Sequence, residues 1–238
     1  MRRPALFARR YIIIAAQLLC AVLICGLVTE ASAHGVDSAT RDFLVSNQGL
    51  AIGPFLYIGA KHMVTGYDHL LFLIAVIFFL YRPKDVIVYV SFFTLGHSIT
   101  LLSGVLGQIS VNPYIIDAII GFSVVYKGFD NLGGFRRLFG FQPNTKAAVL
   151  VFGLFHGFGL ATKLQEFQLP KDGLLVNLIS FNVGVELGQV FALTFVLIGI
   201  VLWRRYESFL RFSTVTNTLI MAAGAVLIGY QLTGYFTA

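Results

Sequence analysis

The sequence predicts an all-α fold, a polytopic bundle of transmembrane helices. Of its 238 residues, 57% are hydrophobic and 12% are charged, whereas soluble domains carry about 25% charged residues. Its apolar stretches approach the ~20 residues that a helix needs to cross ~30 Å of hydrocarbon. The 24 glycines provide small side chains for close contacts between such helices. One helical bundle accounts for this length, so we expect no second folded domain.

The first 33 residues have the pattern of a secretory signal peptide. The first ten residues include four arginines, and an apolar run follows at 11–28. Ala31-Ser32-Ala33 then matches a small-residue cleavage site. Cleavage there makes His34 the first mature residue and removes Cys20 and Cys25, the two cysteines of the chain. The mature protein would then offer no thiolate to a metal ion. Because the apolar run is long, an uncleaved membrane anchor is the alternative.

After the signal peptide we expect a periplasmic segment at 34–49 and a transmembrane domain at 50–238. Residues 50–61 are apolar too, and joined to the first span they would form an overlong helix of ~45 Å at 1.5 Å per residue. We therefore expect them to lie along the membrane interface or to enter it as a broken segment. Apolar runs and the breaks between them predict six spans, at 66–81, 86–106, 113–129, 147–164, 174–203 and 215–236.

Basic side chains are distributed unequally between the loops that join these spans. One side of the membrane has Arg82, Lys84, Lys127, Arg136, Arg137, Lys146, Arg204, Arg205 and Arg211, and the other has Lys163 and Lys171. The positive-inside rule then predicts a bacterial inner-membrane protein with both mature ends in the periplasm. The formal charge of +6 falls to +3 without the signal peptide, whose share is four arginines and one glutamate. Neither a nucleic-acid-binding charge pattern nor a nucleotide-binding motif is present.

Ionisable side chains inside the predicted spans are the main functional feature of the sequence. A charge at the bilayer centre costs roughly 2.5 to 3.5 kcal/mol on translocon scales, so such residues indicate a functional site. On one helix His62 and His69 would share a face, with Gly66 between them and Asp68 about a third of a turn away. The candidate metal ligands are His62, Asp68, His69, His97, His156 and Glu186, and the supporting polar residues are Ser98, Asn182 and Gln189.

Two small-xxx-small patterns, Gly153 to Gly157 and Gly184 to Gly188, permit close approach of helices in lipid. They bracket His156 and Glu186, which we therefore expect to face protein. A single intramembrane histidine has a simpler explanation, an interhelical hydrogen bond of about 0.6 kcal/mol. Asp117 follows Asn112-Pro113, a predicted helix start, where the helix dipole favours a carboxylate and structure alone explains it.

Four ordered motifs resemble the HupE/UreJ family of membrane proteins. They are His62 to Leu73 with its His-x5-Asp-His element, Gly96 to Leu101, Phe155 to Gly159, and Phe181 to Gln189. The resemblance spans nearly all of the mature chain, within the second subgroup of the family, and it implies nickel or cobalt uptake. The first motif is also similar to the His-x4-Asp-His element of nickel/cobalt permeases. The present sequence has one residue more between the first histidine and the aspartate.

The ligand types agree with a borderline divalent cation, because imidazole suits nickel, cobalt, zinc and copper alike. We expect a permease with lipid and a metal ion as its partners, and the sequence leaves the metal and a homo-oligomeric state open. The rival is an intramembrane metal-dependent hydrolase, in which three histidines hold one zinc and Asp68 or Glu186 is the base. One tight cluster open to lipid favours the hydrolase, and a ladder of ligands favours transport. An accessory subunit for metalloenzyme maturation is the third possibility.

A further candidate ligand depends on cleavage of the signal peptide. If cleavage follows Ala33, the α-amine and the imidazole of His34 could chelate one metal ion. The amine must lose its proton to bind, so this capture would weaken at low pH. The alternative is that His34 is incidental to the cleavage site.

Overall fold

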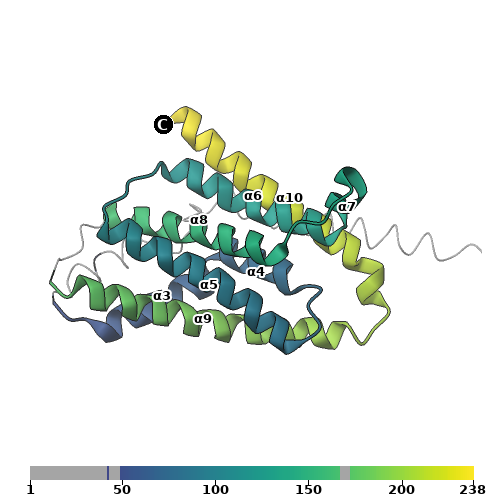
Figure 1. The fold of residues 1–238 in the computed structure, drawn as a ribbon, viewed down its shortest axis with the longest axis horizontal. Coiled ribbons are helices and arrows are strands. Elements are labelled where there is room, and N and C mark those ends of the chain that lie inside the picture. Colours follow the sequence, from purple (N-terminus) through teal and green to yellow (C-terminus); the bar gives the residue numbers. More distant parts are fainter. Residues whose placement is uncertain (1–41, 43–48, 167–171) are drawn as a thin grey trace, which may run out of the picture. The chain divides into compact units, whose positions relative to one another are not determined.

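The computed structural model describes residues 42, 49–166 and 172–238, and these residues contain helices and no strand. The all-α prediction is therefore confirmed for this part of the chain. The predicted signal peptide at 1–33 and the candidate ligand His34 lie outside it. The helices, labelled as in Figure 1, are α3 (Ile52–Thr65), α4 (Tyr67–Ile77), α5 (Pro83–Leu106), α6 (Pro113–Asn131), α7 (Gly134–Phe139), α8 (Thr145–Glu166), α9 (Leu174–Trp203) and α10 (Ser208–Thr237).

Four of the described helices, α5, α8, α9 and α10, are long and apolar enough to cross a membrane. The chain is thus a helical membrane protein, but the predicted number of six spans is not reached by length and composition alone. Helix α4 has only 11 residues. Helix α6 has 19 residues, yet it contains the charged residues Asp117, Lys127 and Asp130, all buried against neighbouring helices.

The first predicted span and the apolar segment before it form two helices, α3 and α4, that are separated at Gly66. This glycine leaves the helical conformation with φ −75° and ψ 86°, and its N–H donates to the carbonyl of His62 at 2.8 Å. A Cβ atom at position 66 would lie 2.9 Å from the same carbonyl oxygen. The break corrects one expectation, because His62 and His69 lie on two helices and do not share a face of one.

Helices pack in three close pairs, α3 with α9, α5 with α8, and α6 with α10 (Figure 1). Glycines let the backbones of each pair approach, as small residues do in membrane helices. The order of contacts along the chain makes α3 parallel to α9 and α5 parallel to α8, whereas α6 and α10 are antiparallel. These contacts are Leu56–Gly184 and Ala60–Gly188, Phe93–Gly153 and His97–Gly157, and Gly121–Gly224 and Gly128–Asn217.

The carboxyl end of the short helix α4 is held by side chains from other helices. The guanidinium of Arg204, just after α9, donates to the carbonyls of Ile77 and Leu80 at 3.0 and 2.8 Å, and it also bonds Phe78. The amide of Asn131 donates to the carbonyl of Ala75 at 2.8 Å. Terminal carbonyls of a helix need such partners, especially where water is absent. These bonds fix α4 within the bundle and so position the side chains on its first turn.

Candidate metal centre

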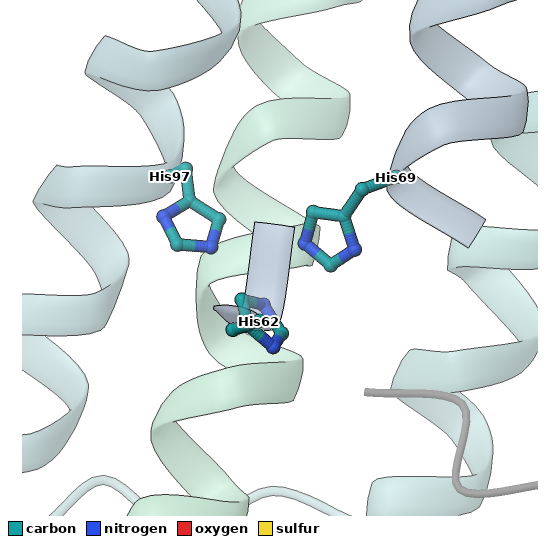
Figure 2. Close-up of side chains that lie close together, drawn as sticks. All are labelled: His62, His69 and His97. Atoms are coloured by element: carbon teal, nitrogen blue, oxygen red, sulfur yellow. The ribbon is translucent and has the colours of Figure 1, made fainter. Parts of the chain in front are cut away.

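Three histidines from three different helices meet in the interior of the bundle. His62 of α3, His69 of α4 and His97 of α5 each offer one ring nitrogen, and these nitrogens all lie within 4.8 Å of one another. All three side chains are buried, with exposures of 1%, 0% and 0%. Figure 2 shows the three rings facing a common centre. The sequence named these residues as candidates, but the tertiary structure brings the third one, 28 positions after His69, to the other two.

The ring spacing is compatible with one shared metal ion. Ring centroids are 4.9 Å apart for His62 and His69, 5.7 Å for His69 and His97, and 6.4 Å for His62 and His97. Nitrogens bound at ~2.1 Å to one tetrahedral ion lie roughly 3.4 Å apart. The imidazoles would have to close by no more than about 1.4 Å from the 4.8 Å limit to reach that spacing.

Asp68 orients one of these histidines. Its Oδ1 lies 2.8 Å from Nδ1 of His69 and accepts the backbone N–H of the same residue, also at 2.8 Å. A carboxylate accepts a hydrogen bond from a protonated Nδ1, so Nε2 of His69 keeps the lone pair that can bind a metal. Carboxylate–histidine pairs of this kind fix the tautomer and ring orientation at metal sites. Asp68, 2% exposed, is therefore placed to orient His69, and its predicted role as a metal ligand stays a prediction.

His156 of α8 is a fourth imidazole beside the cluster. Its ring centroid lies 4.7 Å from that of His69, and its Nδ1 is 2.8 Å from the carbonyl oxygen of Phe152. A carbonyl only accepts hydrogen bonds, so Nδ1 must carry the proton and Nε2 the lone pair. This Nε2 is buried and has no hydrogen-bond partner among the described residues. His156 could thus serve as a further ligand or as a proton acceptor beside the cluster.

Phenylalanine rings form the wall around the histidines. Phe93 lies 5.0 Å from the ring of His156, Phe72 lies 5.4 Å from it, and Phe181 lies 6.0 Å from the ring of His62. All three phenylalanines are buried at 1% exposure or less. An apolar shell limits access of water and lowers the local dielectric, which strengthens the electrostatic interactions of a bound ion.

Close packing of α5 on α8 sets the depth of two of the histidines. A Cβ atom at Gly157 would lie 2.1 Å from the carbonyl oxygen of His97. The hydroxyl of Thr100 donates to the carbonyl of Leu154 at 2.6 Å and ties the same pair of helices together. This register places His97 and His156 at the same level of the bundle.

Glu186 is not brought to the histidine cluster, although it shares a helix face with Asn182 and Gln189. Its side chain is exposed, whereas Gln189 is fully buried. The glycines on either side of it face α3, and Glu186 points away from them. The supporting polar residues bond across α5 and α9: Ser98 donates to Asn182 at 3.1 Å, and Thr94 donates to Gln189 at 3.0 Å.

Two features of this region were not expected from the sequence. The Phe152 carbonyl orients His156, and Asp117 is buried against Lys163 and Gln231. A backbone carbonyl leaves no residue-type signal, but the i, i+4 spacing of 152 and 156 on a helix is compatible with such a bond. Burial of Asp117 depends on contacts between α6, α8 and α10, which a single sequence does not reveal.

Comparison with known protein families gives a match over most of the chain. The family model described as HupE / UreJ protein matches residues 39–238, which is most of the chain. Comparisons with curated proteins and with solved structures gave no match.

Proposed function

Because this chain belongs to the HupE/UreJ family of membrane proteins, we propose that it is a permease for a divalent transition-metal cation, with nickel or cobalt as the expected cargo. The observation that carries this proposal is the cluster of His62, His69 and His97. Three buried imidazoles at one point, on three helices, form a donor set suited to such an ion.

The chemistry of the donors narrows the cargo. Imidazole binds nickel, cobalt, zinc and copper, and hard cations such as magnesium prefer oxygen ligands. Residues 34–238 contain no cysteine, so a soft thiolate site for copper(I) is not available there. Within the remaining group, the family favours nickel or cobalt, and zinc or copper(II) are the competing ions.

The break at Gly66 supports transport. Its two flanking helices carry His62 and His69, so relative movement of α3 and α4 would change the distance between two ligands. Transporters commonly form their substrate sites at such discontinuous helices near the middle of the membrane. A permease must release its ion as well as bind it, and a hinge between two ligands provides a physical means of release.

We also propose a six-span topology, with α3 and α4 together as the first span. Consecutive spans alternate in direction, so the first and fifth spans should be parallel, as should the second and fourth, and the third and sixth should be antiparallel. The observed contacts of α3 with α9, α5 with α8, and α6 with α10 agree with all three relations. The distribution of lysine and arginine then supports an inner-membrane protein with periplasmic mature ends.

An intramembrane metal-dependent hydrolase is the second candidate function, because the histidines form one tight cluster and not a ladder. A hydrolase needs a base for the metal-bound water. Of the two carboxylates considered for this role, Glu186 is exposed away from the cluster, and Asp68 bonds both the ring and the backbone N–H of His69. The positions of both carboxylates favour the permease.

Metal uptake into proteoliposomes tests the proposal. The purified full chain should accumulate Ni²⁺ or Co²⁺ inside the vesicles, and the variants His69→Ala and His97→Ala should lose this uptake while remaining folded. A lost metal-binding imidazole has no substitute, whereas an interhelical hydrogen bond is worth only about 0.6 kcal/mol.

Ser123→Ala is a matched control, because Ser123 is also fully buried and polar but donates to Ile120 within its own helix. It should transport normally. Normal uptake by both folded histidine variants would assign the cluster a structural role. Metal binding without uptake in the wild type would favour the hydrolase or an accessory subunit.

A further inference from the structure

A second buried carboxylate lies outside the histidine cluster. Asp117 of α6 is 6% exposed, and its Oδ2 lies 4.0 Å from Nζ of Lys163 on α8 and 3.3 Å from Nε2 of Gln231 on α10. A favourable position near a helix start explains a carboxylate here, but it does not explain why three helices enclose it. A buried ion pair is costly to form, which raises the question of what Asp117 does.

The ion pair between Asp117 and Lys163 is long compared with a similar pair on α6. Lys127 and Asp130 are also buried on α6, and their charged atoms are 2.6 Å apart. Asp130 further accepts a hydrogen bond from Gln142. The Lys127–Asp130 pair has the geometry of a tight structural ion pair. At 4.0 Å the ammonium of Lys163 is held loosely, and its side chain is 22% exposed, so it can move aside.

The position of Asp117 places it between one end of the bundle and the metal site. Lys163 follows His156 by seven residues on α8, which is two turns or roughly 10 Å along the helix. Asp117 interacts electrostatically with both Asp68 and His69. Tyr67, the first residue of α4, interacts with Asp68 and Asp117 in the same way. Asp117 is therefore close enough to Asp68 and His69 for its charge to act on the histidine cluster, and Glu166 is a further carboxylate that interacts with it.

The charge balance at the histidine cluster suggests a role for the carboxylate of Asp117. Three neutral imidazoles and the single carboxylate of Asp68 leave a divalent ion with one uncompensated positive charge. In a low-dielectric interior, an ion approaching such a site needs a negative charge on its way. The ammonium of Lys163 can neutralise that charge while no ion is there.

We propose that Asp117 is an outer binding site for the divalent cation, which binds there before it reaches the histidine cluster. The ammonium group of Lys163 is the counter-ion of Asp117 in the absence of metal, and the arriving ion displaces it. This inference rests on the proposed metal site. In the proposed topology the outer binding site lies on the periplasmic side. No covalent step is involved: the ion exchanges places with an ammonium group and then moves about two helical turns inward.

The rate of Co²⁺ binding tests this inference, because Co²⁺ bound to imidazoles absorbs visible light and stopped-flow mixing follows its arrival. In the detergent-solubilised full chain, Asp117→Asn should slow association roughly tenfold, the lower range of electrostatic steering effects. Equilibrium affinity should change little in comparison. Lys163→Gln should bind Co²⁺ at least as fast as the wild type. The double variant should be as slow as Asp117→Asn.

The outcomes separate this inference from the proposed function. If Asp117 and Lys163 form only a structural ion pair, both single variants lose thermal stability and the double variant recovers wild-type binding. That result overturns the proposed outer binding site but does not affect the proposed histidine site. Unchanged association in folded Asp117→Asn also overturns it. Wild-type protein without a Co²⁺ spectrum overturns both. As a matched control, Asp130→Asn should lower stability without slowing association.

Discussion

The close contact of α3 with α9 predicts that Gly59→Ala disrupts the proposed metal centre without changing any of its candidate ligands. A Cβ atom at position 59 would lie 2.0 Å from the carbonyl oxygen of Phe181 and 3.0 Å from the backbone nitrogen of Val185. Both atoms belong to the backbone of α9, so no side chain can rotate out of the way. Ordinary contact begins near 3.4 Å, and α3 must therefore move away from α9 by about 1.4 Å.

His62 lies one turn after Gly59 on the same helix and would move with it. The imidazoles already need to close by up to about 1.4 Å to share one ion, and a displacement of ~1.4 Å at α3 adds to that movement. Because metal–ligand distances tolerate only about ±0.2 Å, we expect His62 to bind the ion poorly in this variant. We expect at least a tenfold loss of Co²⁺ affinity, equivalent to about 1.4 kcal/mol. Overpacking should also lower the free energy of unfolding by ~1–3 kcal/mol, partly offset by the better helix propensity of alanine, worth ~1 kcal/mol.

The assay is a Co²⁺ titration of purified protein in detergent, together with thermal unfolding of each variant. Gly53→Ala on the same helix is the matched control, because a Cβ atom at Gly53 meets nothing within 4 Å. It should bind Co²⁺ like the wild type. A folded Gly59→Ala variant with wild-type affinity would show that close contact of α3 with α9 does not position His62.

Three further predictions concern residues around the centre. Asp68→Asn should weaken Co²⁺ binding ~10–100-fold in the same titration, because the amide no longer holds His69 in its metal-binding tautomer; equal affinity would remove its positioning role. Arg204→Ala should lower the melting temperature by roughly 3–6 °C, since a bond to a charged donor contributes ~1.5 kcal/mol or more, whereas the exposed neighbour Arg205→Ala should not. Glu186→Gln should keep Co²⁺ affinity within about twofold, and a tenfold loss would place Glu186 in the site.

The two small-xxx-small motifs illustrate where sequence reasoning succeeded and where it failed. His156 is the third residue after Gly153, so at ~100° per residue it lies about 60° around the helix from that glycine. It is therefore on the side of α8 that packs against α5. Glu186 is the second residue after Gly184, which puts it about 200° away, on the far side of the helix. The expectation that both residues face protein was right for His156 and wrong for Glu186, which is exposed.

The sequence by itself determined the class of the protein and identified the histidines that cluster. Low charge content and long apolar runs allow a membrane-embedded helical bundle, because backbone polar groups in lipid must be satisfied within helices. The cost of ionisable groups in lipid identified the residues that cluster, which are His62, Asp68, His69, His97 and His156, but it also selected Glu186, which does not join them. The family resemblance, carried by motifs around these residues, is confirmed by the match over 39–238.

Only the tertiary structure decided how these groups are arranged. A break at Gly66 places His62 and His69 on two different helices, but the packing of these helices brings the two ring centroids to 4.9 Å from each other. Tertiary packing also buried Asp117 beside Lys163 and left Glu186 exposed. Such outcomes depend on which helix faces which, and therefore on contacts between residues far apart in the chain. Local periodicity gives the faces of each helix, but the partner of each face is a property of the whole bundle.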